Sequence, residues 1–316
     1  MVRYVMMRIG WLLFMLWFIM TVLFFSLHIG MWRFWFQNIP LRLVLQRAWL
    51  LYLDYGANVL SRWDWGSARG GVDAWGLMME RAQISLRINL ITLAVYISLS
   101  IVLGYVSSRK ENGFLDRFIQ LLTLLFISVP NYLWAWFLIF FVGFRWGLLP
   151  PQPHGVEGTL WGDVLILIIP VTALALYPLG KLTALFRGEF LSAQRSLYST
   201  LLKVKGLTAP QMARRHWFKD ALVPILSEIP STFVFVLSSS FLIERYYSIN
   251  GVTLLFFNAM FAPQSGTYVL SVDFPLAMTT TIFFIFLSLS LALTVDVVNA
   301  WLDPRIRLGS KKASIQ

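Results

Sequence analysis

The chain reads Tyr198-Ser-Thr-Leu-Leu-Lys-Val-Lys-Gly-Leu-Thr-Ala-Pro-Gln-Met-Ala-Arg-Arg-His-Trp-Phe-Lys-Asp-Ala-Leu-Val-Pro224 at the centre of a polar, basic segment, residues 181–220, that separates two long apolar stretches. Before Gly206, residues 187–205 hold no proline and a single glycine, Gly188. A glycine just past a helix end commonly adopts the left-handed conformation that closes the helix. The pattern therefore predicts a helix over 187–205 that ends in a turn at Gly206.

A second, shorter helix is predicted directly after this turn. Thr208 is followed three residues later by Gln211, which is the spacing of a capping box. Pro210 falls in the first turn, where its missing N–H does no harm. The helix is expected over about residues 209–218, with two adjacent arginines towards its C-terminal end, where the helix dipole favours positive charge. The chain would then re-enter the membrane at Pro224.

The composition indicates a membrane protein. The chain is 58% hydrophobic and 13% charged, whereas a soluble domain is about a quarter charged. The net charge of +11 is attributed to basic loops that fix membrane orientation, and no nucleic-acid partner is expected. Cysteine is absent, which excludes disulfides, thiolate catalysis and cysteine-based zinc sites. The three histidines are widely separated, which argues against a metal site: His28, His154 and His216.

Six apolar stretches are long enough to cross about 30 Å of hydrocarbon. They are residues 9–29, 88–106, 118–144, 164–185, 221–243 and 274–295. The first is too long for a signal peptide and has no Ala-x-Ala-like site after it, so it is expected to be retained. Prolines inside spans, such as Pro130, are tolerated where neighbouring helices satisfy the freed carbonyl. The predicted fold class is an all-α membrane protein with about six transmembrane helices.

The charges of the short loops predict the orientation. Loop 107–117 has three basic residues and segment 181–220 has eight, whereas 145–163 and 244–273 have one each. By the positive-inside rule, the basic loops and both termini are cytoplasmic. The long first loop, 30–87, has seven basic residues and is still placed outside, because long loops are weak evidence. Its tryptophans are expected to form an interfacial belt, some of them a lid over an outer cavity.

A short basic helix on the cytoplasmic face has two interpretations. It can rest on anionic lipid headgroups, or it can dock into a cytoplasmic partner and pass motion to the spans. The helical pattern alone leaves both open.

The same segment resembles the EAA loop of ABC importer permeases, and most of all its dipeptide/oligopeptide version. The matching residues are Lys205-Gly206-Leu207, Arg215-His216, Ala221-Leu222 and Pro224. Further matches follow the family's order: Asp64-Trp65-Gly66-Ser67, Ser128-Val129-Pro130, Trp146-Gly147-Leu148-Leu149-Pro150, Glu244 with Ser248-Ile249 and Gly251, Asp273-Phe274-Pro275, and Asp303-Pro304-Arg305. Each match alone is weak, but seven in order, across about residues 51–308, make the resemblance specific.

The chain also departs from the family pattern. The alanines of the loop are replaced by Leu202 and Val204, the asparagine by Asp220, and the proline after Ser248-Ile249 by Asn250. The bulkier residues suggest an adjusted contact with the ATPase. The usual Gly-Asp-Pro after the first span is missing, which bears on substrate class more than on mechanism.

The resemblance implies the type I ABC importer transmembrane architecture with a cytoplasmic coupling helix. It divides the chain into an N-terminal transmembrane helix (1–30), an extracytoplasmic loop (31–87), a permease core (88–303) with the coupling loop 187–220, and a cytoplasmic tail (304–316). The expected location is the cytoplasmic (inner) membrane of a prokaryote, as a multi-pass protein among membrane lipids.

The expected partners are a second homologous permease subunit, two ATP-binding subunits and an extracytoplasmic solute-binding protein. The sequence has no Gly-x-x-x-x-Gly-Lys-Ser/Thr phosphate loop, so ATP and Mg are expected in the ATPase partners, and no cofactor in this chain. The chain is thus predicted to be a transport subunit with no catalytic residues. The motion of the ATPases would reach the spans through the loop around Gly206 and alternate the access of the pore.

The resemblance assigns ATPase coupling to Tyr198, Lys203, Lys205, Gly206, Leu207, Thr208, Gln211, Arg214, Arg215, His216, Asp220 and Pro224. Glu228 is the one acid well inside an apolar span, and it is interpreted either as lining the pore or as paired near the cytoplasmic boundary. Ser238, Ser239 and Ser240 either line a polar pathway or pack helices closely.

The leading hypothesis is a permease subunit of a peptide importer. Within the same family, nickel chelates, glutathione or oligosaccharides are alternative substrates. A stand-alone secondary transporter usually has inverted repeats and midplane charges, which this sequence does not clearly show. A membrane enzyme lacks support, because no nucleophile or metal constellation is present.

Overall fold

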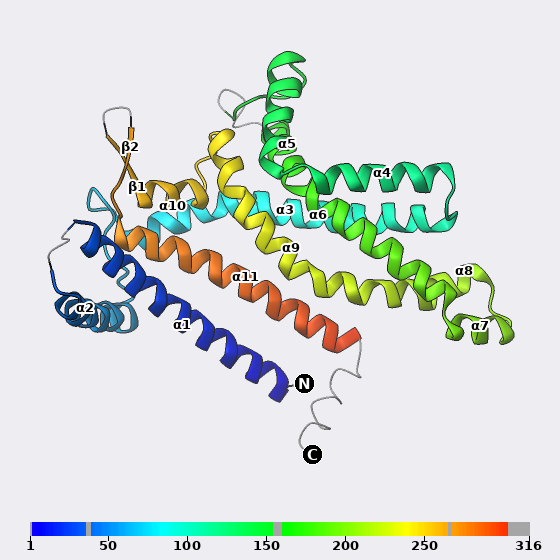
Figure 1. The fold of residues 1–316 in the computed structure, drawn as a ribbon, viewed down its shortest axis with the longest axis horizontal. Coiled ribbons are helices and arrows are strands. Elements are labelled where there is room, and N and C mark those ends of the chain that lie inside the picture. The colour runs from blue at the N-terminus through cyan, green and yellow to red at the C-terminus, as the bar shows by residue number, and fades with distance from the viewer. Residues whose placement is uncertain (1, 36–38, 154–159, 265–266, 303–316) are drawn as a thin grey trace. The chain divides into compact units, whose positions relative to one another are not determined.

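The computed structural model describes residues 2–35, 39–153, 160–264 and 267–302, and it is almost entirely helical (Figure 1). The helices are α1 (Val2–Trp35), α2 (Leu41–Arg62), α3 (Ala74–Arg109), α4 (Phe114–Ser128), α5 (Asn131–Phe137), α6 (Leu160–Arg195), α7 (Leu197–Val204), α8 (Ala209–Met212), α9 (Phe218–Tyr246), α10 (Val252–Met260) and α11 (Phe274–Leu302). Two π-helical turns, η1 (Leu138–Arg145) and η2 (Ala213–Trp217), continue α5 and α8. The strands β1 (Phe261–Gln264) and β2 (Thr267–Leu270) form one antiparallel hairpin.

The chain divides into two compact units. The first comprises Met1–Leu86 with Ile249–Leu293, and the second comprises Arg87–Ser248 with Thr294–Gln316. Each unit brings together segments that are far apart in the sequence.

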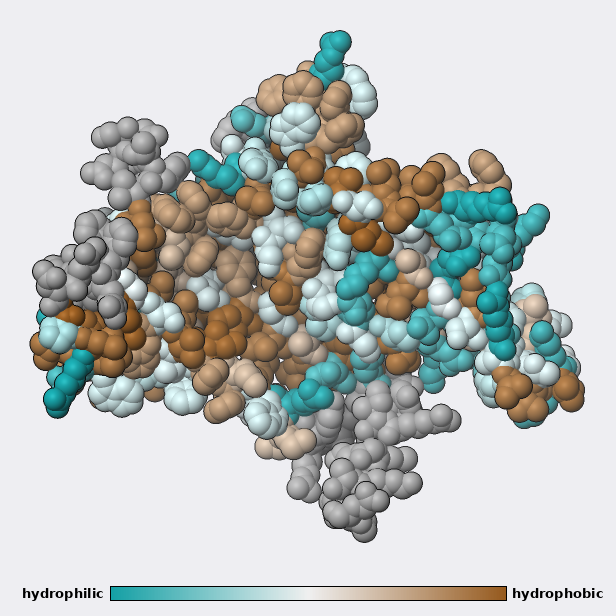
Figure 2. Space-filling model, viewed as in Figure 1, coloured by the Kyte–Doolittle hydropathy of each residue, from teal (hydrophilic) through white to brown (hydrophobic). Residues whose placement is uncertain are grey.

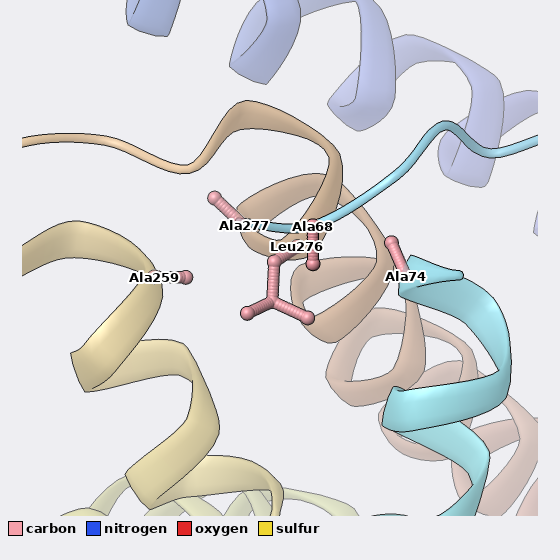
Figure 3. Packing of buried hydrophobic residues seen from close by; sticks show 5 residues of the cluster. All are labelled: Ala68, Ala74, Ala259, Leu276 and Ala277. Atoms are coloured by element: carbon pink, nitrogen blue, oxygen red, sulfur yellow. The ribbon is translucent and has the colours of Figure 1, made fainter. Parts of the chain in front are cut away.

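The first unit has a core of small side chains around the start of α11. Ala68, Ala74, Ala259, Leu276 and Ala277 converge there from a loop and three helices (Figure 3). Small residues let the backbones approach closely, which is how helices pack when lipid offers no hydrophobic contrast. Asp273 caps this start, because its carboxylate accepts from the backbone N–H of Leu276 and, at 2.6 Å, from that of Arg69.

The second unit is built on α6 and α9, which pack against each other, with α4 and α5 on α6. Glycines permit two of the close approaches. A Cβ on Gly104 of α3 would lie 2.9 Å from the Phe186 side chain, and one on Gly180 of α6 would lie 2.9 Å from the Thr123 carbonyl oxygen. At the end of α9, the Tyr247 hydroxyl donates to the Pro150 carbonyl at 2.5 Å, and burial raises the pKa of Tyr247 to about 12. Tyr247 therefore stays a neutral donor at physiological pH.

The predicted fold class is confirmed. Among the residues that the structure describes, five helices are long and apolar enough to cross a membrane: Met6–Met31, Ala74–Arg109, Trp161–Arg195, Ala209–Tyr246 and Phe274–Asn299. The pair Phe114–Ser128 and Asn131–Arg145 passes the same test together but is bent by 102°, so the number of spans is six if this pair counts as one. Most of these helices are longer than the predicted apolar stretches. Their additional turns consist largely of polar residues, which the search for apolar stretches left out.

The prediction that residues 118–144 form one span with Pro130 inside it was wrong in its geometry. Pro130 instead precedes the first residue of α5, and Val129 is extended with φ −103° and ψ 123°. Proline disfavours the helical region for the residue before it, so the chain turns there rather than running on.

Candidate functional site

The segment singled out by the sequence folds around α7, an eight-residue helix between two breaks. The first break is Ser196, whose hydroxyl oxygen accepts from the Ser199 backbone N–H at 3.2 Å and so caps the new helix. α6 therefore ends at Arg195, ten residues short of the predicted end of a single helix at 205. The prediction missed this break because serine caps a helix only where the backbone is already extended.

The second break is Gly206, and here the predicted left-handed turn is confirmed. Gly206 has φ +82°, its N–H donates to Lys203 O at 2.9 Å, and the next N–H, of Leu207, donates to Leu202 O at 3.2 Å. These two bonds together form a Schellman motif, which satisfies the last carbonyls of α7. Leu202 is buried and Leu207 is half-buried.

The capping box after the turn is confirmed as well. The Gln211 side-chain oxygen accepts from the Thr208 backbone N–H at 2.9 Å, and Pro210 lies in the first turn of α8. The predicted end of this helix near residue 218 was wrong, because α8, η2 and α9 follow one another without a break from Ala209 to Tyr246. Pro224 lies inside α9. The isolated short helix is therefore α7.

Two side chains of η2 contact the face of α7 that packs against the rest of the unit. The Trp217 indole N–H donates to the Ser199 hydroxyl at 3.2 Å, and the Trp217 ring meets Phe190 of α6 edge to face. The Tyr198 hydroxyl lies 3.2 Å from His216 Nδ1, and the two rings are also edge to face. α7 is thus fixed to the C-terminal end of α6 and to the helix that continues from η2 into α9.

The opposite side of α7 exposes apolar side chains. Leu197, Leu201 and Val204 are 87%, 60% and 82% exposed, and their spacing of four and three residues places them on one face. Figure 2 shows apolar side chains at this end of the unit beside hydrophilic ones. The nearby basic residues Lys203, Lys205, Arg214 and Arg215 are exposed. An exposed apolar patch with a polar rim is the usual character of a docking surface.

Gly206 and the exposed face together predict a strong effect of substitution at the turn. Replacing Gly206 by Val is expected to lower transport at least about tenfold, because a β-branched residue at φ +82° costs on the order of 1–2 kcal/mol and tilts the end of α7. A Cβ there would meet no atom within 4 Å, so backbone strain alone is tested. The measurement is uptake at matched membrane levels.

Two variants control this experiment. Gly206→Asn is expected to keep most uptake, because asparagine tolerates the left-handed region. Gly188→Ala, at a helical glycine with open space around it, is expected to be neutral. Unchanged uptake in Gly206→Val would refute a structural requirement for this turn.

Two ion pairs that the sequence did not reveal tie α6 to the start of α4 and to the turn before it. The Arg187 Nε and Nη2 donate to the two carboxylate oxygens of Asp116, both at 2.7 Å. The Asp116 carboxylate also accepts from the Ser107 hydroxyl and, at 2.8 Å, from the Asn112 backbone N–H. At the end of α6, Arg195 pairs with Glu111. Both pairs join residues more than 70 positions apart, so local patterns could not have found them.

The predicted pathway residues lie on different sides of α9. Ser238 is exposed and donates to the Val234 carbonyl at 2.9 Å, Ser239 is half-buried, and Ser240 is buried. Ser240 Oγ accepts from the Asn89 amide and donates to Glu244 at 3.3 Å, so it takes part in internal packing. Glu228 pairs with Lys181 of α6 and accepts from the Ser231 hydroxyl.

The remaining predicted residues are placed as follows. Asp220 is exposed, Pro224 is half-buried within α9, and Gln211 and Thr208 are exposed around the capping box. His154 and the stretch Asp303-Pro304-Arg305, with the tail 304–316, lie outside the described residues. In the ranges that the structure describes, no group of three or more His, Asp or Glu side chains could hold a metal ion.

A helical chain with several candidate membrane spans and a short exposed helix between two of them fits a transport permease, and comparison with known proteins supports that class. Residues 76–308 match the family described as the binding-protein-dependent transport system inner membrane component. This range covers well over half of the chain, so the chain belongs to that family. It is a multi-pass inner-membrane transport subunit rather than an enzyme, as predicted.

The curated relatives are permeases of peptide systems. The chain is 28% identical to the dipeptide transport system permease protein DppB of Lactococcus lactis subsp. cremoris, over 98% of this chain and 100% of the relative. It is 26% identical to DppB of Bacillus subtilis, over 82% and 80% of the two chains. It is 24% identical to the oligopeptide transport system permease protein OppB of Haemophilus influenzae, over 83% and 81%. The predicted resemblance is therefore confirmed.

Proposed function

We propose that this chain is a permease subunit of an ATP-driven importer of peptides. The family depends on a binding protein for transport, and the relatives named above are dipeptide and oligopeptide permeases. The match to the Lactococcus lactis protein extends over nearly the whole chain, including the first loop that departs from the family pattern. This full-length match favours peptides over nickel chelates, glutathione or oligosaccharides.

The proposed assembly contains a second homologous permease, two ATP-binding subunits and an extracytoplasmic solute-binding protein. ATP and Mg are used in the ATP-binding subunits, because this sequence has no phosphate loop. Both termini and the α7 region face the cytoplasm of a prokaryotic cell, since the basic residues concentrate in these segments. The domains are proposed as 1–30, 31–87, 88–303 and 304–316, with coupling loop 187–220.

The observation that carries the proposal is the exposed apolar face of α7. Leu197, Leu201 and Val204 point away from the rest of the unit, while Trp217 and His216 hold the underside. An isolated chain would not leave three aliphatic side chains in water beside basic residues without a partner to cover them. The ATP-binding subunit is the proposed partner, and the residues of the coupling loop shape or surround this face.

The proposal is tested by uptake of a labelled dipeptide and tripeptide in cells that lack this gene. Peptide uptake is expected to be lost in the deletion strain and restored by the wild-type chain. Normal peptide uptake in the deletion strain, when no second peptide importer is present, would contradict the peptide assignment. Loss of nickel uptake alone would assign the chain to a metal chelate instead.

The translocation pathway is proposed to follow the open side of α9. Ser227, Ser231, Val234 and Ser238 are exposed at intervals of three and four residues, so they form one stripe along the helix. Hydroxyl groups can face hydrocarbon once they bond to the preceding turn, but Glu228 beside this stripe is too polar for lipid. We therefore propose that this face lines one half of a water-filled pathway, in which water hydrates its polar groups. The second permease would form the other half.

Cysteine labelling distinguishes this face from the packed one. The chain has no native cysteine, so Ser231→Cys or Ser238→Cys introduces its single thiol. In the assembled transporter, these thiols are expected to react with a water-soluble maleimide on the order of tenfold faster than Ser240→Cys, because exposure governs thiol reactivity. Faster labelling of Ser240→Cys would place the pathway elsewhere. Equal labelling rates of the Ser231, Ser238 and Ser240 variants would also contradict the proposal that this face of α9 lines the pathway.

A further inference from the structure

Lys181 of α6 and Glu228 of α9 form an ion pair inside two membrane-spanning helices. Their side chains are 41% and 31% exposed, and the Glu228 carboxylate also accepts from the Ser231 hydroxyl at 2.5 Å. Both residues lie within candidate spans, Trp161–Arg195 and Ala209–Tyr246. The pair is therefore neither buried in the protein core nor outside the membrane-spanning helices.

A half-exposed ion pair cannot face lipid tails at low cost. Ionisable groups within spans are expensive, and they almost always face a bundle interior or a water-filled cavity. Glu228 is next to the exposed stripe of Ser227, Ser231 and Ser238, which the proposed function assigns to the pathway. The pair thus lies where a passing solute would come within reach.

The depth of the pair places it towards the cytoplasmic end. Lys181 is four residues from the end of the apolar stretch 164–185, and Glu228 is seven residues from the start of the stretch 221–243. At 1.5 Å per residue, these distances are about 6 and 10 Å along the helices. A solute would therefore meet the two charges late in its passage, shortly before release.

We infer that Lys181 and Glu228 act as a counter-charge pair that binds the two termini of a zwitterionic peptide on its way through the pathway. The Glu228 carboxylate accepts from the peptide's terminal ammonium group, and the Lys181 ammonium donates to the terminal carboxylate. This inference rests on the proposed function, since the solute must carry a free ammonium group and a free carboxylate, as an unblocked peptide does.

The chemistry of the exchange supports this role. Without a solute the two side chains neutralise each other, so the pathway carries no unpaired charge in its resting state. A peptide that enters a narrow polar pathway loses water from its charged ends, and charge-assisted hydrogen bonds replace that hydration. The ion pair between Lys181 and Glu228 opens, and each side chain forms a new ion pair with one terminus of the peptide. The site therefore attracts a solute with both charges, whereas an ion of a single sign would leave one side chain unpaired.

The test compares two substrates in the complete transporter. Uptake is measured for a peptide with free termini and for the same peptide with an acetylated N-terminus and an amidated C-terminus. The peptide is chosen so that the wild-type complex imports both forms. The double variant Lys181→Met with Glu228→Gln removes both charges and leaves neither one unpaired. The ratio of free to blocked uptake is expected to fall about tenfold, since hydrogen bonds to charged groups contribute that much or more. The binding protein is the same throughout, so its own preference cancels.

A matched control removes another ion pair of the same unit, Arg195 with Glu111, which lies at the cytoplasmic end of α6. The variant Arg195→Met with Glu111→Gln is expected to leave the ratio unchanged, even if total uptake changes. An unchanged ratio in the Lys181 and Glu228 double variant, with the protein present in the membrane, would overturn the inference and leave the pair as a structural tie. Failure of the wild-type complex to import any peptide would instead refute the proposed function.

Discussion

Replacing Asp116 by Ala is expected to lower the free energy of unfolding by about 3–5 kcal/mol, because it leaves a largely buried charge without its partner. The Asp116 side chain is fully buried and is the acceptor for both nitrogens of the Arg187 fork. Its loss also leaves the Ser107 hydroxyl and the Asn112 N–H without their acceptor. The measurement is the thermal stability of the detergent-solubilised chain by size-exclusion chromatography of a fluorescent fusion.

The exposed ion pair between Arg195 and Glu111 is the matched control. Glu111→Gln removes the carboxylate that faces Arg195, and a solvent-exposed ion pair contributes only about 0–1 kcal/mol. A second control, Asp116→Leu with Arg187→Met, removes both charges and is expected to recover most of the loss, since no charge remains unpaired. If Asp116→Ala were as mild as Glu111→Gln, the buried pair would not hold α4 to α6.

Replacing Leu201 by Glu is expected to abolish coupling to the ATPase while the chain still inserts and folds. Leu201 lies between Leu197 and Val204 in the middle of the exposed face of α7 and is 60% exposed, so the change disturbs little within the chain. Loss of a central contact residue costs about 2 kcal/mol or more, which is about 30-fold in affinity, and a buried unpaired charge adds a desolvation cost. The measurements are peptide uptake and retention of the ATP-binding subunit during purification.

Thr200→Glu provides the control for added charge. Thr200 is exposed on the same helix but lies about 100° around it from Leu201, at the flank of the apolar face. It introduces the same carboxylate one residue away and is expected to cost only a few-fold in retention. Equal losses in both variants would mean that negative charge near the basic residues, rather than the apolar face, causes the effect.

The local features of the site could be predicted from the sequence because their causes are local. Glycine is the residue type that reaches the φ of +82° found at Gly206 without strain. Thr208 and Gln211 have the spacing of a capping box. Apolar stretches of about 20 residues indicated the spans for the same reason, since the thickness of the bilayer sets their length.

The remaining features depend on contacts between distant segments. Local patterns predicted a helix end near residue 218, whereas the helix runs on from Ala209 to Tyr246 with Pro224 inside α9, because neighbouring helices can satisfy the carbonyl that a proline frees. Ser196 and Ser240 are ordinary serines in the sequence, yet the first caps α7 and the second joins a buried network. The sequence left two interpretations of Glu228 open, a residue that lines the pore or a residue paired near the membrane boundary. In the structure Glu228 has a partner, Lys181, which lies 47 residues away in the sequence.

The central claim is that α7 is the part of this chain that contacts an ATP-binding subunit. Val204→Cys places the only thiol of the chain on the exposed face of α7, and a cysteine-directed photo-crosslinker can then capture its neighbour in the assembled transporter. The account predicts one dominant crosslink, to an ATP-binding subunit that co-purifies with the chain. Crosslinks to lipid alone, with no ATP-binding subunit in the purified complex, would contradict it.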